Sequence, residues 1–258
     1  MNTLYKIKII SLFTMRDILK SKILLNVFLI GLGMMLLTYV AAEFTYGVPD
    51  RVALDTGLGM LTLSSLGIAL FMGATLISKE IDSRTVYMII SRPVPRYAFI
   101  LGKVVGLLFV LIINIALLAA MTLIATSFLG GTIDSLVLWS ILFILIESLL
   151  LLLVVLFFSL VSNNILAIII SMVLLLLGHA IQDTQSMLFV TQRPLLKFLL
   201  DFYHLVLPGF YKLNLKDFVL YKQSLPLSYL LGSMTYGLAY CGFLLSLIIV
   251  IFDKKNLD

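Results

Sequence analysis

Long apolar runs, separated by short polar segments, dominate the pattern of the chain. A helix needs about 20 apolar residues to cross roughly 30 Å of hydrocarbon, and six runs reach or approach that length. The pattern therefore predicts an all-α, polytopic membrane protein with six transmembrane helices within residues 23–258. The runs are Ile23–Ala42, Leu58–Ser78, Ile100–Phe128, Leu136–Val161, Ile165–Ile181 and Tyr229–Phe252.

The segment before the first run, residues 1–22, is also predicted to be helical. On a helical wheel its apolar residues gather on one side and most polar residues on the other. We expect a cytoplasmic amphipathic helix along the inner leaflet; a plain basic tail is the alternative. The apolar side holds Leu4, Tyr5, Leu12, Met15 and Leu19, and the polar side holds Thr3, Lys6, Thr14, Asp17 and Ser21.

A second polar segment, residues 182–228, precedes the last apolar run. Aromatic residues alternate there with charged ones, and Pro208-Gly209 interrupts the pattern. Aromatic side chains favour the membrane–water interface. We expect short external helices at the headgroup level before the last span, with a small folded cap as the alternative.

Composition excludes an ordinary soluble domain. The chain has 258 residues and is 62% hydrophobic and 12% charged, against about 45–50% and about 25% in soluble domains. Of its 18 basic residues, 12 lie in segments that would face the cytoplasm and six in segments outside. This bias predicts that both termini are cytoplasmic. The 12 are Lys6, Lys8, Arg16, Lys20, Lys22, Lys79, Arg84, Arg92, Arg96, Lys103, Lys254 and Lys255.

The segment between the second and third runs has charged residues and prolines at distinctive spacings. Pro93 and Pro95 disfavour helical geometry at the residues before them, so the chain must turn sharply there. The segment resembles the corresponding part of the ABC-2 type permease family. Six positions match that pattern, namely Glu80, Thr85, Pro93, Arg96, Gly102 and Lys103. Arg84 departs from it, because the family usually has glycine there.

The resemblance implies a membrane-spanning permease subunit that forms a homodimer or heterodimer. Separate ATPase subunits would bind ATP and magnesium on the cytoplasmic side, and the direction would be export across a prokaryotic cell membrane. Other expected partners are membrane lipids and, in some members, a periplasmic protein; nucleic acid is not expected. Segment 79–99 would couple to the ATPase through Glu80, Asp82, Arg84, Thr85, Arg92, Pro93, Arg96 and Lys103.

The chain carries no motif for catalysis or nucleotide binding. Gly102-Lys103 lacks the upstream glycine and the following Ser or Thr of a phosphate-binding loop. With one cysteine and two histidines, a metal site or disulfide framework is not expected. We therefore predict no enzyme activity and no cofactor in this chain. An ATP-independent secondary carrier and a membrane-anchored accessory protein or enzyme are the alternatives.

Glu147 is the candidate residue for the translocation path. It stands near the middle of the fourth run, where an ionised carboxylate costs about 2.5–3.5 kcal/mol. It should therefore face protein or water. It could line the translocation path or act as a proton-linked switch. The structural alternative is a hydrogen bond to Asn114, Ser148 or a partner helix. We interpret His179 as part of an interfacial polar cluster. Small residues of the second run form a packing face within or between subunits: Ser65, Ala69 and Gly73.

Overall fold

The regular elements in the described part of the chain are all helices. The computed structural model describes residues 3–20, 23–44, 49–82, 95–185, 193, 195, 200 and 207–254. Among these residues, four helices are long and apolar enough to cross a membrane, which indicates a membrane protein. They are α3 (Pro49–Asp82), α5 (Arg96–Phe128), α6 (Ser135–Val161) and α11 (Leu227–Lys254).

The two remaining apolar runs also lie in helices. α2 extends over Ile23–Phe44 and α7 over Asn164–Gln185. Within them the apolar stretches are shorter, at Val27–Val40 and Asn164–Ala180. Each predicted run therefore corresponds to one helix, while the number of helices that cross the bilayer stays a prediction.

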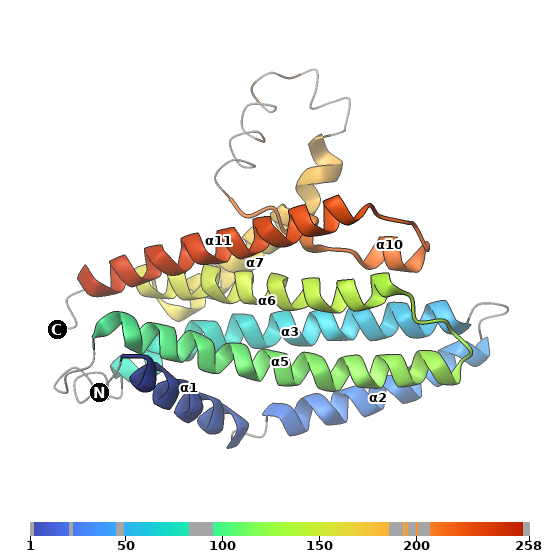
Figure 1. The fold of residues 1–258 in the computed structure, drawn as a ribbon, viewed down its shortest axis with the longest axis horizontal. Coiled ribbons are helices and arrows are strands. Elements are labelled where there is room, and N and C mark those ends of the chain that lie inside the picture. The colour runs from blue at the N-terminus through green and yellow to red at the C-terminus, as the bar shows by residue number, and fades with distance from the viewer. Residues whose placement is uncertain are drawn as a thin grey trace.

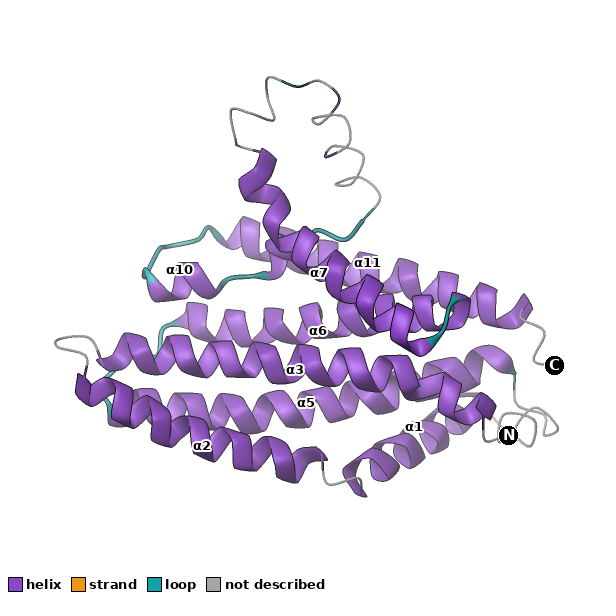
Figure 2. Ribbon diagram, turned by 180° about the vertical axis from the view of Figure 1, so that it is seen from behind, coloured by secondary structure: helices purple, strands orange, loops and turns teal. Residues whose placement is uncertain are grey.

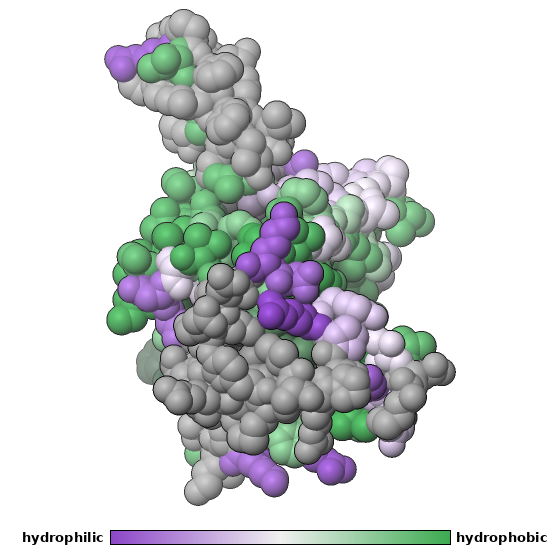
Figure 3. Space-filling view, turned by 90° about the vertical axis from the view of Figure 1, so that its left-hand side faces the viewer, coloured by the Kyte–Doolittle hydropathy of each residue, from purple (hydrophilic) through white to green (hydrophobic). Residues whose placement is uncertain are grey.

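The helices run back and forth along a common direction, so their ends collect at two opposite ends of a bundle (Figure 1). One end holds the beginning of α1 (Thr3–Lys20), the end of α3, the beginning of α5 and the end of α11. The turn between α6 and α7 lies at that end as well. Viewed end-on, described hydrophilic side chains gather there, and hydrophobic ones cover the adjoining flank (Figure 3).

Helix α6 lies at the centre of the bundle. It packs against α3 and α5 on one side and α7 and α11 on the other (Figures 1 and 2). Seven consecutive residues, Leu150 to Leu156, are at most 3% exposed. Because seven residues cover nearly two helical turns, α6 is surrounded on every side there. A side chain on this helix must therefore find its partner inside the protein.

The small residues of α3 form a packing face within the subunit. Ser65 and Ala69 are fully buried, and a Cβ added to Gly73 would lie 3.3 Å from the Leu152 carbonyl oxygen of α6. Close approach of backbones is what small side chains allow in membrane helices. In the structure, this face therefore packs within the subunit.

Helix α1 packs along the first half of α5. Two glycines of α5, Gly102 and Gly106, make room for it: an added Cβ at either position would lie 2.7 Å from atoms of α1. The buried side of α1 consists of Ser11, Thr14 and Ile18. Its apolar stripe points elsewhere, with Leu4, Tyr5 and Leu12 exposed. The helix is docked through small residues, and its placement at a leaflet stays a prediction.

Two short helices occur in the described part of segment 182–228. They are the 3-10 helix η1 (Phe210–Leu213) and α10 (Lys216–Leu220). Their apolar side chains pack into the bundle against α3, α6 and α7, and Phe210 and Leu213 are fully buried. The described part of the segment therefore contributes to the core, and its place at the headgroup level stays a prediction.

Candidate functional site

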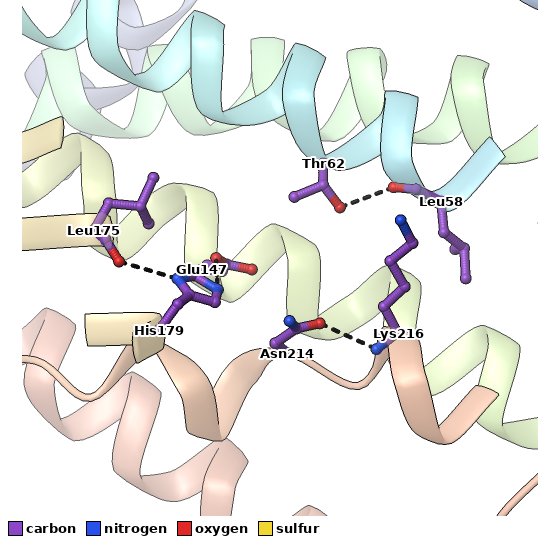
Figure 4. Close-up of polar contacts among 7 residues, drawn as sticks. All are labelled: Leu58, Thr62, Glu147, Leu175, His179, Asn214 and Lys216. Atoms are coloured by element: carbon purple, nitrogen blue, oxygen red, sulfur yellow. Dashed lines mark hydrogen bonds and ion pairs between the residues drawn. The ribbon is translucent and has the colours of Figure 1, made fainter. Parts of the chain in front are cut away.

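Glu147 of α6 lies against His179 of α7. The carboxylate is 2% exposed, and its Oε1 lies 3.2 Å from His179 Nε2 (Figure 4). The distance is that of an ion pair, and Oε1 has no hydrogen-bond partner among the described residues. A buried carboxylate oxygen without a hydrogen bond costs free energy. A ligand that donates a hydrogen bond to this oxygen would remove that cost.

Two contacts fix the orientation of the His179 ring. Nδ1 lies 3.0 Å from the backbone carbonyl oxygen of Leu175, and the ring stacks on Phe210 with centroids 6.2 Å apart and planes 8° from parallel. A carbonyl oxygen only accepts, so Nδ1 carries a hydrogen. In the neutral ring, Nε2 then presents a lone pair to the Glu147 carboxylate. The pair is satisfied only when one proton lies on Nε2 or on Glu147.

A cavity of about 330 Å³ adjoins this pair. It is lined by α3, α6, α7, the connection from η1 to α10 and the first residue of α10 (Figure 4). The volume lies at the lower end of the range for small-molecule pockets. A polar group of a bound molecule could reach the buried carboxylate, while its body would meet apolar walls. The lining residues are Leu58, Gly59, Thr62, Leu63, Ser140, Ile144, Glu147, His179, Asn214, Leu215 and Lys216.

Lys216, the first residue of α10, also lines the cavity. Its Nζ lies 2.8 Å from Asp55 Oδ1 on α3, and the Asn214 side-chain oxygen accepts a hydrogen bond from the Lys216 backbone nitrogen at 3.1 Å. Gly59 leaves room for the ammonium, because an added Cβ would lie 3.2 Å from Nζ. The Lys216 ammonium is thus paired with the Asp55 carboxylate.

The predicted hydrogen-bond partners of Glu147 make other contacts. Asn114 is fully buried on α5, where its Nδ2 donates to Ser65 Oγ at 3.2 Å and its Oδ1 accepts from Ser64 Oγ at 3.1 Å. Ser148 donates to the Leu145 carbonyl. Asn114 therefore links α3 to α5, and within the described residues Glu147 contacts His179.

The predicted coupling residues lie at one end of the bundle or outside the described residues. Glu80 and Asp82 are in the last turn of α3. Arg96 begins α5, and its Nη1 donates to the carbonyls of Phe252 and Asp253 at 3.4 and 2.9 Å. Lys103 Nζ lies 5.8 Å from the centre of the Phe99 ring. Arg84, Thr85, Arg92 and Pro93 lie outside the described residues.

Sequence reasoning missed the role of His179, although a signal was present. Helices α6 and α7 are antiparallel and joined by a two-residue turn, Ser162-Asn163, in which Asn163 Oδ1 accepts from the Leu166 backbone N–H at 2.9 Å. Residues at similar distances from such a turn lie at a similar depth. Glu147 stands 15 residues before Ser162, and His179 stands 16 residues after Asn163. Counting residues from the turn would have predicted that Glu147 and His179 lie close together.

The described residues contain no cluster of three or more His, Cys, Asp or Glu side chains placed to hold a metal ion. The candidate site consists of the Glu147 carboxylate, the His179 imidazole and the cavity beside them. No family model matches the chain, and no curated protein matches it.

Proposed function

We propose that this chain is the membrane-spanning permease subunit of an ATP-binding cassette transporter. It dimerises and is driven by separate ATPase subunits to export a substrate or transmit force. The sequence resemblance around Glu80 to Lys103 and the bundle of long apolar helices support this proposal. The membrane is then a prokaryotic cell membrane, and both termini are cytoplasmic.

One structural observation carries the proposal. The beginning of α5, which includes the last part of the resemblance, is tied to two other helices at the same end of the bundle. Arg96 holds the end of α11, and Gly102 and Gly106 hold α1. A partner that pushes on the beginning of α5 would move α1, α5 and α11 together. This is the mechanical arrangement that a coupling segment needs.

Copurification with an ATPase tests the proposal. The chain is coexpressed with a candidate ATPase subunit, purified in detergent and reconstituted into vesicles. We expect a stable complex whose ATP hydrolysis drives transport, and Arg92→Glu should uncouple hydrolysis from transport. Lys254→Glu, at the same end but outside segment 79–99, is the matched control. Full transport by the chain alone would contradict the proposal.

The Glu147–His179 contact favours a second candidate, an ATP-independent secondary carrier. Ionisable residues inside a membrane often belong to proton relays of such carriers. Vesicles that contain only this chain discriminate the two functions. Flux driven by a pH gradient without ATP supports the carrier, and flux that needs both ATP and the ATPase supports the permease.

A further inference from the structure

The cavity beside Glu147 contains an acceptor without a hydrogen bond. Glu147 is 2% exposed, lines the cavity, and its Oε1 has no hydrogen-bond partner among the described residues. A buried carboxylate in this condition is stabilised by a proton or by a positively charged N–H donor. An uncharged apolar molecule would leave the oxygen as it is.

The orientation of His179 limits what can occupy this place. Because Nδ1 faces the Leu175 carbonyl at 3.0 Å, the acidic partner of Glu147 is Nε2, 3.2 Å away. One proton between these atoms satisfies both. A ligand ammonium that donates to Glu147 satisfies the carboxylate in place of that proton. A protonated imidazole would repel the ammonium, so His179 is neutral when the ligand is bound. Ligand and proton therefore compete for one place.

Among the side chains that the structure describes, few other charges face this pair. Asp55 of α3 lies 2.8 Å from Lys216 of α10, so the charges of these two side chains compensate each other. The other α3 residues in the lining, like those from α6 apart from Glu147, are not titratable. From η1 the neighbour is the Phe210 ring, and α11 contributes no residue to the lining. When the shared proton leaves and His179 is neutral, the Glu147 carboxylate is the one negative charge among the described lining residues that has no cationic partner. A bound cation would then replace the proton.

We propose that this cavity is a cation-exchange site, in which an organic ammonium binds Glu147 and displaces the proton shared with His179. The displaced proton leaves to bulk water, and the ammonium keeps its own protons, so charge is conserved. The proposal names the substrate class of the transporter proposed above and rests on that function. The substrate is a small amine with an apolar body.

The size and the walls of the cavity agree with such a ligand. Its volume of about 330 Å³ equals that of roughly ten water molecules. Leu58, Leu63, Ile144 and Leu215 supply apolar walls, while Thr62, Ser140 and Asn214 add hydroxyl and amide groups. A short alkyl chain would contact the leucines, with its ammonium at Glu147.

Calorimetric titration of the purified full chain in detergent tests the proposal. Butylammonium chloride is the probe, and butan-1-ol is its uncharged counterpart. Titrations in two buffers of different ionisation enthalpy count the protons released. We expect butylammonium to bind with release of one proton, and its affinity to rise with pH across about pH 5 to 8, because fewer protons then compete. Butan-1-ol should bind about tenfold or more weakly.

Glu147→Gln is the decisive variant. Its amide N–H can donate to His179 Nε2, so the pair is satisfied without a shared proton and the fold should be kept. We expect the affinity for butylammonium to fall about tenfold or more and proton release to disappear. Asp134→Asn is the matched control: the same chemical change at the exposed beginning of α6, with binding unchanged.

Three results would overturn the proposal: no butylammonium binding by the wild-type chain, equal binding of butan-1-ol, or binding without proton release. All three measurements use only the wild-type protein, so they hold even if Glu147→Gln does not fold. Because no ATPase is present, failure here leaves the permease proposal standing. Conversely, ammonium binding by a chain that never associates with an ATPase would retain the site and reject the permease.

Discussion

Arg96 at the beginning of α5 donates a hydrogen bond of 2.9 Å to the carbonyl oxygen of Asp253, the last residue but one of α11. The last carbonyls of a helix have no partner within it and carry partial negative charge. A guanidinium satisfies both requirements. Arg96, which the sequence placed among ATPase-coupling residues, thus also has a structural contact inside the subunit.

Replacing Arg96 should therefore weaken the protein itself. Arg96→Gln removes the charge and the bond to α11, and we expect a loss of about 1 kcal/mol of stability. Thermal unfolding in detergent measures this. Lys254→Gln, an exposed cation at the same end of α11, is the control and should change little. Equal stability of the Arg96 variant and the wild type would remove the structural role.

Gly106 should be required for the docking of α1. A side chain there meets the Ser11 carbonyl oxygen and Thr14 Cβ, both 2.7 Å from an added Cβ. We expect Gly106→Val to lower stability by about 1–3 kcal/mol through overpacking. Gly232→Val on α11, where nothing lies within 4 Å of an added Cβ, introduces the same β-branched residue into a helix without the clash. A similar loss for both variants would assign the effect to helix propensity.

Glu147 and His179 should show coupled stability. Glu147→Leu leaves Nε2 of the half-buried His179 without its partner, and we expect a loss of about 1 kcal/mol. Adding His179→Phe removes that unsatisfied nitrogen and keeps a ring against Phe210, so the double variant should recover most of the loss. Unfolding of both single variants and the double variant closes the cycle. Additive effects would show that the two side chains do not interact.

Labelling of introduced cysteines tests the orientation. Lys8 and Lys254 are exposed at one end of the bundle, and Gln223 is exposed in the connection from α10 to α11. Gln223 is a better position than Lys212, whose Nζ lies 4.4 Å from the centre of the Tyr236 ring. Cysteines at positions 8 and 254 should react from the cytoplasm, and one at 223 only from outside. The native Cys241 is buried and should not react.

The sequence by itself determined the helices. The apolar run Leu136–Val161 became α6, beginning one residue earlier, and the turn after it lies at Ser162-Asn163. Backbone hydrogen bonds of a helix are local, and the transfer of apolar side chains from water adds up residue by residue. Both quantities can therefore be read along the chain without knowledge of the packing.

Only the tertiary structure decided which side chains meet. Asn114, expected beside Glu147, bonds to Ser64 and Ser65 of α3 instead, and α1 packs through Ser11 and Thr14 rather than through its apolar stripe. Each of these contacts depends on the rotation of one helix against another. That rotation is set by close packing of many side chains at once, including glycines such as Gly106. Periodicity within one helix carries no information about it.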